Sequence, residues 1–416
     1  MKRFSNLALL LVAGLAANLV LISAGTSGLG TPMGDLDFAY QPWADQVVHF
    51  GTLLGISSAW VYPYPALIPI LMANLATPGH LAVAWLIGRT VLMLAILVAM
   101  VLYKTSEEDR QRRYVAAYAW IGFTIALGPV SISRIDTVSV MIAVLGALAL
   151  ATGARLGAAS FWTVAAWIKI WPVALFISIA TERKNWFKVI AYGAAISVGF
   201  LVLAFLLGGN LNVFSFITGQ GERGLQIEAP MATPWLWAAV LGATDAGIYY
   251  NQALLTFEVF GPAAQQIAFW LGPVQAGAVA ITIALGILGN RAIDKAGAQL
   301  SETLANARRN EVIAWTALTA TLDLIVFNKV GSPQFISWLA VPIILGVLLG
   351  VRRWAVASTL VLILSGLTWW VYPVVYDGIL ASHAFATGVL LLRNIVEVIA
   401  LIYANYRLTA LASKSA

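Results

Sequence analysis

The chain alternates long apolar runs with short charged segments, and this alternation limits its possible folds more than any other feature. Residues 7–24 form an apolar run behind Lys2 and Arg3, and similar runs recur to the end of the chain. Runs of this kind match the length that an α-helix needs to cross a bilayer. Hydrophobic residues make up 61% of the chain and charged residues only 10%, which excludes a soluble enzyme, a disordered chain and a collagen-like fibre. The sequence predicts an all-α polytopic membrane protein, with residues 1–416 forming a single domain.

One apolar segment, residues 158–180, differs from the other predicted spans. Basic residues flank it on both sides, and Lys169-Ile-Trp-Pro172 interrupts it. Proline removes a backbone donor and ends a helix. We predict a hairpin of two short helices that enters and leaves at the cytoplasmic side, giving about twelve membrane helices in all. The other predicted spans are residues 7–24, 81–103, 115–131, 135–154, 189–209, 266–289, 311–330, 335–350, 355–376 and 386–408.

The distribution of charge predicts the orientation. Basic residues at the start place the N-terminus in the cytoplasm, with a retained first helix rather than a cleaved signal peptide. Of the 24 lysines and arginines, all but six fall in predicted cytoplasmic loops and ends. This bias explains the net charge of +6 without a nucleic-acid partner. We expect a multi-pass protein of the cell membrane with both termini cytoplasmic. The six exceptions are Arg89, Arg134, Lys169, Arg223, Lys329 and Arg393.

Two long segments, residues 25–64 and 210–264, fall on the predicted outer side. They carry Trp, Tyr, Pro, Asp and Glu among apolar residues, so any chemistry is expected on the outer face. Within them, residues 43–54 and 249–260 fit amphipathic helices that lie on the membrane surface. The chain has no cysteine and three histidines, which excludes thiolate chemistry and disfavours a metal centre. We therefore expect neither a metal ion nor a cofactor.

Asp35 and Asp37 lie just beyond the outer end of the first predicted helix. An ionised carboxylate there can act as general base for a sugar hydroxyl. The alternative is that both are solvated acids that cap an interfacial helix. Aromatic and polar residues of the outer segments are candidates for the wall of a pocket, although aromatic side chains also form membrane-interface belts. The candidates are Tyr40, Trp43, Tyr62, Tyr64, Gln226, Glu228 and Gln334.

Four basic residues outside the cytoplasmic segments are candidates for binding a phosphate. Lys169, at the tip of the predicted hairpin, is costly at membrane depth, and such residues usually face a cavity or a partner. Arg223 can form bidentate bonds to a phosphate or a surface salt bridge. Arg134 can act in the same way or pair with Asp136, and Lys329 lies in a predicted outer turn. An acid beside several cations at this boundary suits a phosphorylated lipid that carries a group for transfer.

These segments resemble the GT-C superfamily of integral-membrane glycosyltransferases. Within it, the chain is most similar to the polyprenol-phosphate-mannose-dependent α-mannosyltransferases of glycosyltransferase family 87. The matching motifs occur in family order over most of the chain. They are GDLDFAY with Trp43 (34–43), WVYPYPAL (60–67), SRID (133–136), KIWP (169–172), GERGLQIEA (221–229) and NKVGSPQFISW (328–338).

The resemblance implies a GT-C-like bundle that transfers a sugar from a polyprenyl-phosphate donor to a glycolipid or glycan acceptor outside the cell. Mannose is the expected sugar at the level of the family. The resemblance assigns the base of an inverting reaction to Asp35, with Asp37 in reserve. It assigns the donor phosphate to Arg223 and Lys329, with Lys169 and Arg134 behind them. A glutamine, Gln334, stands where the family often carries His or Gln, and metal dependence is not expected for such donors.

A secondary transporter or a flippase of lipids or lipid-linked sugars is the alternative function. It would also need charges within the membrane, such as Asp323, Lys329, Arg393 and Glu397. The last two are four residues apart on one predicted helix, which favours an internal ion pair between them. Many transporters also show matching halves, and this sequence shows none.

Overall fold

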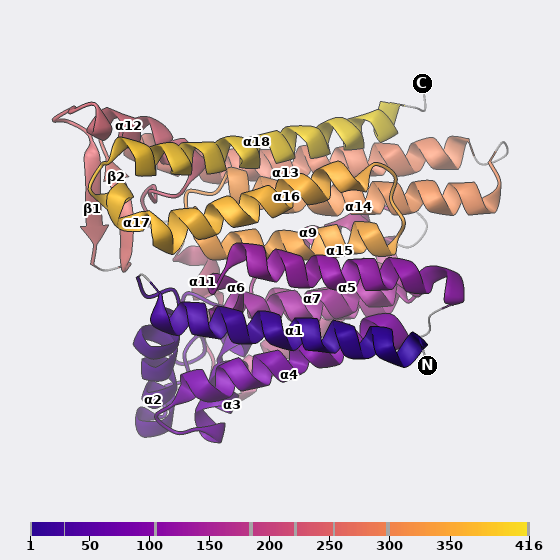
Figure 1. Ribbon diagram of the computed structural model, residues 1–416, viewed down its shortest axis with the longest axis horizontal. Coiled ribbons are helices and arrows are strands. Elements are labelled where there is room, and N and C mark those ends of the chain that lie inside the picture. Colours follow the sequence, from indigo (N-terminus) through magenta and orange to yellow (C-terminus); the bar gives the residue numbers. More distant parts are fainter. Residues whose placement is uncertain are drawn as a thin grey trace.

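The computed structural model describes residues 2–28, 30–103, 106–182, 186–219, 223–252, 254–296 and 300–413. Within these residues the chain is mostly helical. The long helices run side by side, and the first residues of α1 (Lys2–Ser27) lie at the same end as the last residues of α18 (Ala384–Ser413) (Figure 1). Arg183, Lys184 and Glu222, which belong to charged segments considered above, lie outside the described residues.

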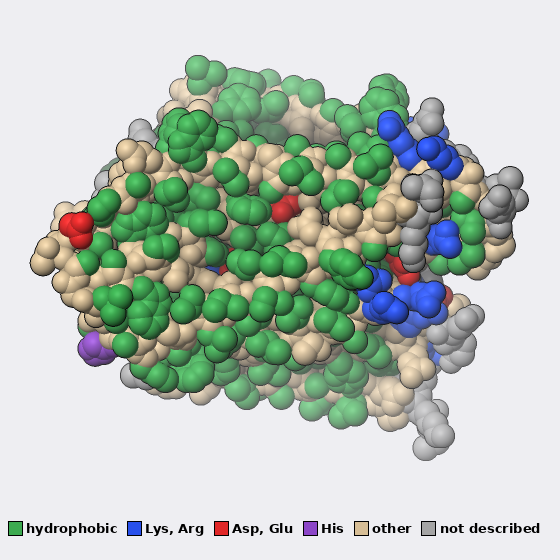
Figure 2. Space-filling model, turned by 90° about the horizontal axis from the view of Figure 1, so that it is seen from above, with side chains coloured by type: hydrophobic (Ala, Val, Ile, Leu, Met, Phe, Trp, Pro, Cys, Tyr) green, Lys and Arg blue, Asp and Glu red, His purple; other side chains and the backbone are tan. Residues whose placement is uncertain are grey.

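Six helices in the described part of the chain are long and apolar enough to cross a membrane. Their outer faces carry exposed aliphatic side chains, such as Val91, Val202 and Ile281. Hydrophobic side chains cover the middle of the molecule in Figure 2. An apolar surface of this extent indicates a membrane environment, so the protein is a multi-pass membrane protein. The six are α1, α4 (Leu81–Leu102), α10 (Trp186–Leu206), α13 (Ala264–Lys295), α16 (Trp354–Trp369, continued to Val374) and α18.

Four further helices occupy predicted spans, but each is either less apolar or shorter than the six. Two of them, α5 (Glu107–Leu127) and α14 (Glu302–Val326), begin with charged turns. The other two, α7 (Ile135–Ala151) and α15 (Ala340–Leu348), are short. Most side chains of α7 and α15, and those of the second half of α14, are buried. These helices therefore form the inner part of the bundle.

The predicted break into two short helices is confirmed. Helix α8 (Arg155–Ile168) ends at Lys169, and α9 (Val173–Ala180) begins after Pro172. The Arg155 guanidinium forms an ion pair with Glu182, so the two ends of the hairpin meet. Segment 155–182 therefore enters the bundle and returns to the same end.

Lysine and arginine side chains gather at the end of the molecule where the two termini lie (Figure 2). We call this the basic end. It contains the Arg155–Glu182 pair, and Arg309 lies 3.7 Å from the same carboxylate and 2.8 Å from Asp294. The one-sided distribution of charge agrees with the predicted positive bias.

The opposite end, here called the site end, carries the short elements. Helix α2 (Gln41–Phe50) runs across the direction of the long helices in Figure 1. It ends at Gly51, whose φ of 66° is favourable for glycine, so the helix predicted over 43–54 stops before its last residues. The other short helices are α3 (Leu67–Ala76), α6 (Val130–Ser133), α11 (Ser215–Thr218), α12 (Thr233–Val240) and α17 (Tyr376–Leu380). Short 3₁₀- or π-helical segments lie at Leu36–Tyr40, Tyr64–Ala66, Leu211–Phe214, Pro230–Ala232, Pro333–Leu339 and Trp370–Val374.

The helix predicted over 249–260 is wrong. Strands β1 (Gly247–Asn251) and β2 (Thr256–Phe260) form an antiparallel pair with Tyr249 opposite Glu258. Aromatic and β-branched residues dominate both strands, and such side chains pack well across a pleated pair. The pairing also brings the Tyr249 hydroxyl to the Glu258 carboxylate, a contact that one surface helix would not provide.

Large aromatic side chains pack against glycines in the core. The Trp162 indole lies where a Cβ on Gly146 would be, and Trp354 lies in the same way against Gly346. Each indole donates a hydrogen bond to a backbone carbonyl, of Ala143 and Ile343 respectively. Small residues allow this close approach between membrane helices. The inner helices are thus fixed in register at the basic half of the bundle.

Replacing Glu182 with Gln should destabilise the fold by about 3 kcal/mol, because two arginines then lose the carboxylate between them. The exposed pair Arg112–Asp109, 3.5 Å apart, provides the control. Asp109→Asn should cost less than about 1 kcal/mol, since exposed pairs contribute little. Unfolding in mixed micelles with increasing SDS measures both variants. Equal stability of Glu182→Gln and the unaltered protein would contradict the role assigned to the pair.

Candidate active site

A cavity of about 1330 Å³ opens at the site end. Its wall comes from segments that lie far apart in the sequence, between Asp35 and Tyr376. Most of the residues that the sequence singled out line this one cavity. They are Asp35, Trp43, Tyr62, Arg134, Lys169, Arg223, Gln226, Glu228, Lys329 and Gln334.

Three predicted site residues lie outside the cavity wall. Asp37, two residues after Asp35, is exposed on the surface. Tyr40 is fully buried, and its hydroxyl accepts a hydrogen bond from the Ile135 amide at 2.7 Å. The Tyr64 hydroxyl donates to the Phe200 carbonyl at 2.9 Å. Both tyrosines therefore support the structure behind the cavity.

Asp35 forms an ion pair with Arg134. Asp35 lies in the segment after α1, and Arg134 directly precedes α7. The Asp35 side chain is 35% exposed and the Arg134 side chain 12%. Pairing of Arg134 with Asp136 was one prediction from the sequence; the structure instead joins Arg134 to Asp35. The pair holds the Asp35 carboxylate at the cavity wall.

Lys169 is neutralised by Asp136. Its Nζ lies 3.4 Å from Oδ2 of the carboxylate, whose other oxygen accepts a hydrogen bond from the Trp338 indole at 2.6 Å. The ammonium also lies 4.3 Å from the centre of the Tyr62 ring. Trp338 stacks on Trp171 with ring centres 5.7 Å apart. These contacts fix the tip of the α8–α9 hairpin in the wall of the cavity.

Residues 223–229 lie along β2 and extend the strand pair. The backbone amide of Ile227 donates to the Phe257 carbonyl at 3.2 Å, and that of Val259 donates to the Leu225 carbonyl at 2.9 Å. On the other side, the backbone N–H of Gln226 donates to the backbone carbonyl of Lys329 at 3.0 Å. Backbone pairing therefore places Arg223 and Lys329 on adjoining parts of the same wall.

Glu258 organises this region, and the sequence analysis did not single it out. Glu258 is 1% exposed. Its carboxylate accepts hydrogen bonds from the Tyr249 hydroxyl at 2.5 Å, the Asn251 side-chain amide at 3.2 Å and the Gly224 backbone N–H at 3.2 Å. The bond to Glu258 is the main reason that the pKa of Tyr249 rises to about 12. Two runs of β-forming residues on either side of a polar turn, at 247–251 and 256–260, were the available signal.

The electrostatics of Arg223 and Lys329 favour an anion. Burial lowers the pKa of both side chains. The neighbouring Arg223 charge lowers the pKa of Lys329 further. An anion placed between them would relieve this repulsion and replace lost hydration.

Glu228 belongs to a second buried network. Its carboxylate accepts a hydrogen bond from the Tyr376 hydroxyl at 2.8 Å, and burial raises its pKa. The Glu228 carbonyl accepts a bond from Arg393 at 3.1 Å. Arg393 also pairs with Glu397 at 2.7 Å, both side chains being buried. The predicted internal pair is thus confirmed, and it supports the loop that lines the cavity.

Gln334 offers an open hydrogen-bond acceptor. Within the described part of the chain, its side-chain carbonyl oxygen is buried and has no hydrogen-bond partner. Buried polar atoms without a partner are uncommon in native structures. The oxygen lies in the wall of the cavity, where a ligand hydroxyl can donate to it.

Trp43 forms an aromatic wall with its neighbours. Its ring lies 5.3 Å from that of Trp60 and 5.8 Å from that of Tyr62, both edge-on. It also stacks on Tyr40 at 5.6 Å. This wall adjoins the Lys169 side chain through Tyr62.

Among the described residues, no group of three or more His, Asp and Glu side chains is placed to hold a metal ion. Comparison with known proteins places the chain in no family, because no family model, curated protein or solved structure matches it. The chemistry of the cavity is therefore inferred from its own residues.

Gly331 allows the two cation-bearing loops to touch. A Cβ at this position would overlap the backbone of Glu228 and Ala229. Gly331→Ala should separate the loops and lower stability by about 1–3 kcal/mol. It should also speed tryptic cleavage after Arg223. Gly366→Ala, at a site with open space around it, is the control and should do neither. Unchanged proteolysis in Gly331→Ala would show that the contact does not order the loops.

Proposed function

We propose that the protein is a glycosyltransferase that moves a sugar from a polyprenyl-phosphate donor to a lipid-linked or cell-envelope glycan acceptor. One observation carries the proposal: a single cavity collects the Asp35 carboxylate, the cations Arg223 and Lys329, and the open acceptor of Gln334. Its volume of about 1330 Å³ exceeds that of most small-molecule pockets, which favours two substrates at once. The resemblance noted in the sequence assigns mannose as the sugar.

The cavity also reaches the lipid-facing surface. Ala268, Phe269 and Gly272 of α13 belong to its wall, and Phe269 is 70% exposed. Helix α13 is one of the six long apolar helices, so its exposed side chains face acyl chains. A substrate with a polyprenyl chain can lie against this wall while its phosphate and sugar occupy the polar part.

The proposed reaction uses the residues as follows. Arg223 and Lys329 bind the donor phosphate, and Asp35 accepts the proton of the acceptor hydroxyl. The acceptor oxygen attacks the anomeric carbon while the bond from that carbon to the phosphate oxygen breaks. The polyprenyl phosphate leaves with the electron pair, and the two cations stabilise its added charge. Attack opposite the leaving group inverts the anomeric centre.

The remaining cations have supporting roles in this proposal. Arg134 pairs with Asp35 and holds it at the cavity wall, and Lys169 pairs with Asp136. The cavity lies away from the basic end, which favours an active site on the outer face of the cell membrane and cytoplasmic termini.

Transport of a lipid or a lipid-linked sugar is the competing function. Buried charged side chains within the bundle have fixed partners: Arg393 forms an ion pair with Glu397, and Asp323 accepts a hydrogen bond from the Thr282 hydroxyl at 2.6 Å. None of these four side chains is part of the cavity wall. Charges held in this way favour a fixed scaffold around a reaction site over a path for cargo.

Asp35→Asn should lower sugar transfer by about 100-fold or more, because it removes the proposed base. Asp37→Asn is the matched control and should change transfer little, since Asp37 lies outside the cavity wall. The assay uses protein in nanodiscs with radiolabelled polyprenyl-phosphate mannose and a host lipid extract. Equal rates in the two variants would exclude Asp35 as the base. Failure of the unaltered protein with mannose, arabinose, glucose and galactose donors would favour transport.

The donor KM should rise as the pH becomes alkaline. Because the pKa of Lys329 is lowered, this side chain loses its proton, and its attraction for phosphate, earlier than an exposed lysine. Lys329→Arg keeps its charge to higher pH, so the rise in KM should shift upward. Donor KM is measured for both proteins from about pH 7 to about pH 10, which spans the titration of lysine. A rise at the same pH in both would exclude Lys329 from phosphate binding.

A further inference from the structure

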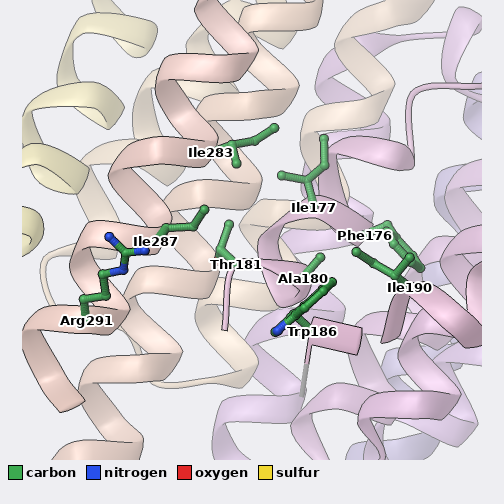
Figure 3. A pocket seen from close by; sticks show the side chains of 9 residues that line it. All are labelled: Phe176, Ile177, Ala180, Thr181, Trp186, Ile190, Ile283, Ile287 and Arg291. Atoms are coloured by element: carbon green, nitrogen blue, oxygen red, sulfur yellow. The ribbon is translucent and has the colours of Figure 1, made fainter. Parts of the chain in front are cut away.

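A second cavity, of about 560 Å³, lies between α9, α10 and α13 (Figure 3). None of its lining residues belongs to the cavity at the site end. It is within the usual volume range of ligand pockets. The lining residues are Phe176, Ile177, Ala180, Thr181, Trp186, Ile190, Ile283, Ile287 and Arg291.

The polar groups of this cavity are concentrated at one end. Figure 3 shows Arg291 and Trp186 at the level where α10 begins, and Ile283 and Ile177 farther along the helices. Arg291 and Ile283 are eight residues apart on α13, which corresponds to about 12 Å along a helix. The rest of the lining is aliphatic or aromatic apart from Thr181. The cavity therefore offers a charged entrance and an apolar depth of about two helical turns.

The surface around the cavity is apolar. Two of its three helices, α10 and α13, are long and apolar, and only 17% of the most apolar stretch of each is buried. Trp186 at the entrance is 48% exposed. Tryptophan at a helix end is typical of the membrane–water interface. The medium that reaches this cavity from the side is thus the bilayer.

Arg291 supplies a positive charge at the entrance of the cavity. It is exposed, and it forms no ion pair with any residue that the structure describes. The nearest acid on the same helix, Asp294, pairs with Arg309 at 2.8 Å. A cation at the basic end attracts the anionic headgroups of the adjoining leaflet.

We propose that this cavity binds one anionic phospholipid, with its phosphate on Arg291, its headgroup at the level of Trp186 on the opposite side of the entrance, and an acyl chain along Ile283, Ile287 and Ile177. The match of charge at the entrance and apolar lining in the depth is what selects this occupant. A soluble anion would use only the entrance, and a neutral lipid would leave Arg291 without a counter-charge. The inference does not depend on the glycosyltransferase proposal, because the two cavities share no lining residue.

Native mass spectrometry of the full chain in detergent tests the site. The protein is titrated with phosphatidylglycerol or with phosphatidylcholine of the same acyl chains. We expect tighter binding of phosphatidylglycerol and a loss of about fivefold in its affinity in Arg291→Ala, the effect of one basic residue near a lipid surface. Lys295→Ala removes an exposed charge from the same end of α13, outside the cavity, and should retain the preference.

A second variant tests the apolar depth. Ile287→Trp should fill the cavity and weaken binding of both lipids, while Lys295→Ala leaves it unchanged. Melting in detergent shows that each variant is folded before titration, and Ile287→Trp alone decides the matter if Arg291→Ala does not fold. The proposal is wrong if Arg291→Ala and Lys295→Ala reduce phosphatidylglycerol binding equally, or if Ile287→Trp binds both lipids as the unaltered protein does.

Discussion

The Asp136 carboxylate is the charge on which the site end depends. It is 1% exposed and lies between the Lys169 ammonium and the Trp338 indole. A buried carboxylate without partners is unfavourable by several kcal/mol, so the three segments that meet at it stabilise one another. The tip of the α8–α9 hairpin can lie within the bundle because Asp136 neutralises Lys169 at that depth. Without that stop, the wall between the hairpin tip and residues 333–338 would not exist.

The hairpin is fixed at both of its ends, by different chemistry. At the basic end, Glu182 joins Arg155 and Arg309, which ties the hairpin to α14. At the tip, Lys169 and Trp171 contact the Asp136 and Trp338 side chains. Between these two ends, buried apolar side chains such as Trp162, which lies against Gly146, pack the hairpin into the bundle. This arrangement provides a rigid wall for the cavity, which is what precise placement of reacting groups requires.

The sequence predicted the helical bundle and the broken hairpin because apolar run length and proline act locally. Most of the candidate site residues that it singled out line the cavity wall, since charged and aromatic side chains in outer segments often face a cavity or a partner. Three features depend on contacts between distant segments and were not predictable in this way. The first is the pairing of Asp35 with Arg134 in place of Asp136. The second is the strand pair at 247–260, whose residues also fit an amphipathic helix. The third is Glu258, whose importance comes from donors that the strand pairing brings to it.

The cavity wall joins the beginning of the chain to its end. The Tyr372 hydroxyl lies 3.4 Å from the Thr31 carbonyl oxygen, 341 residues away in sequence, and Tyr376 shares the wall with Asp35. A chain made from its N-terminus inserts Asp35 long before residues 372–376 leave the ribosome. The part of the wall around Asp35 therefore stays incomplete until residues 372–376 have been synthesised. The cavity can therefore bind a ligand only late in biosynthesis. A chain truncated before α16 would have most of its membrane helices but an incomplete cavity.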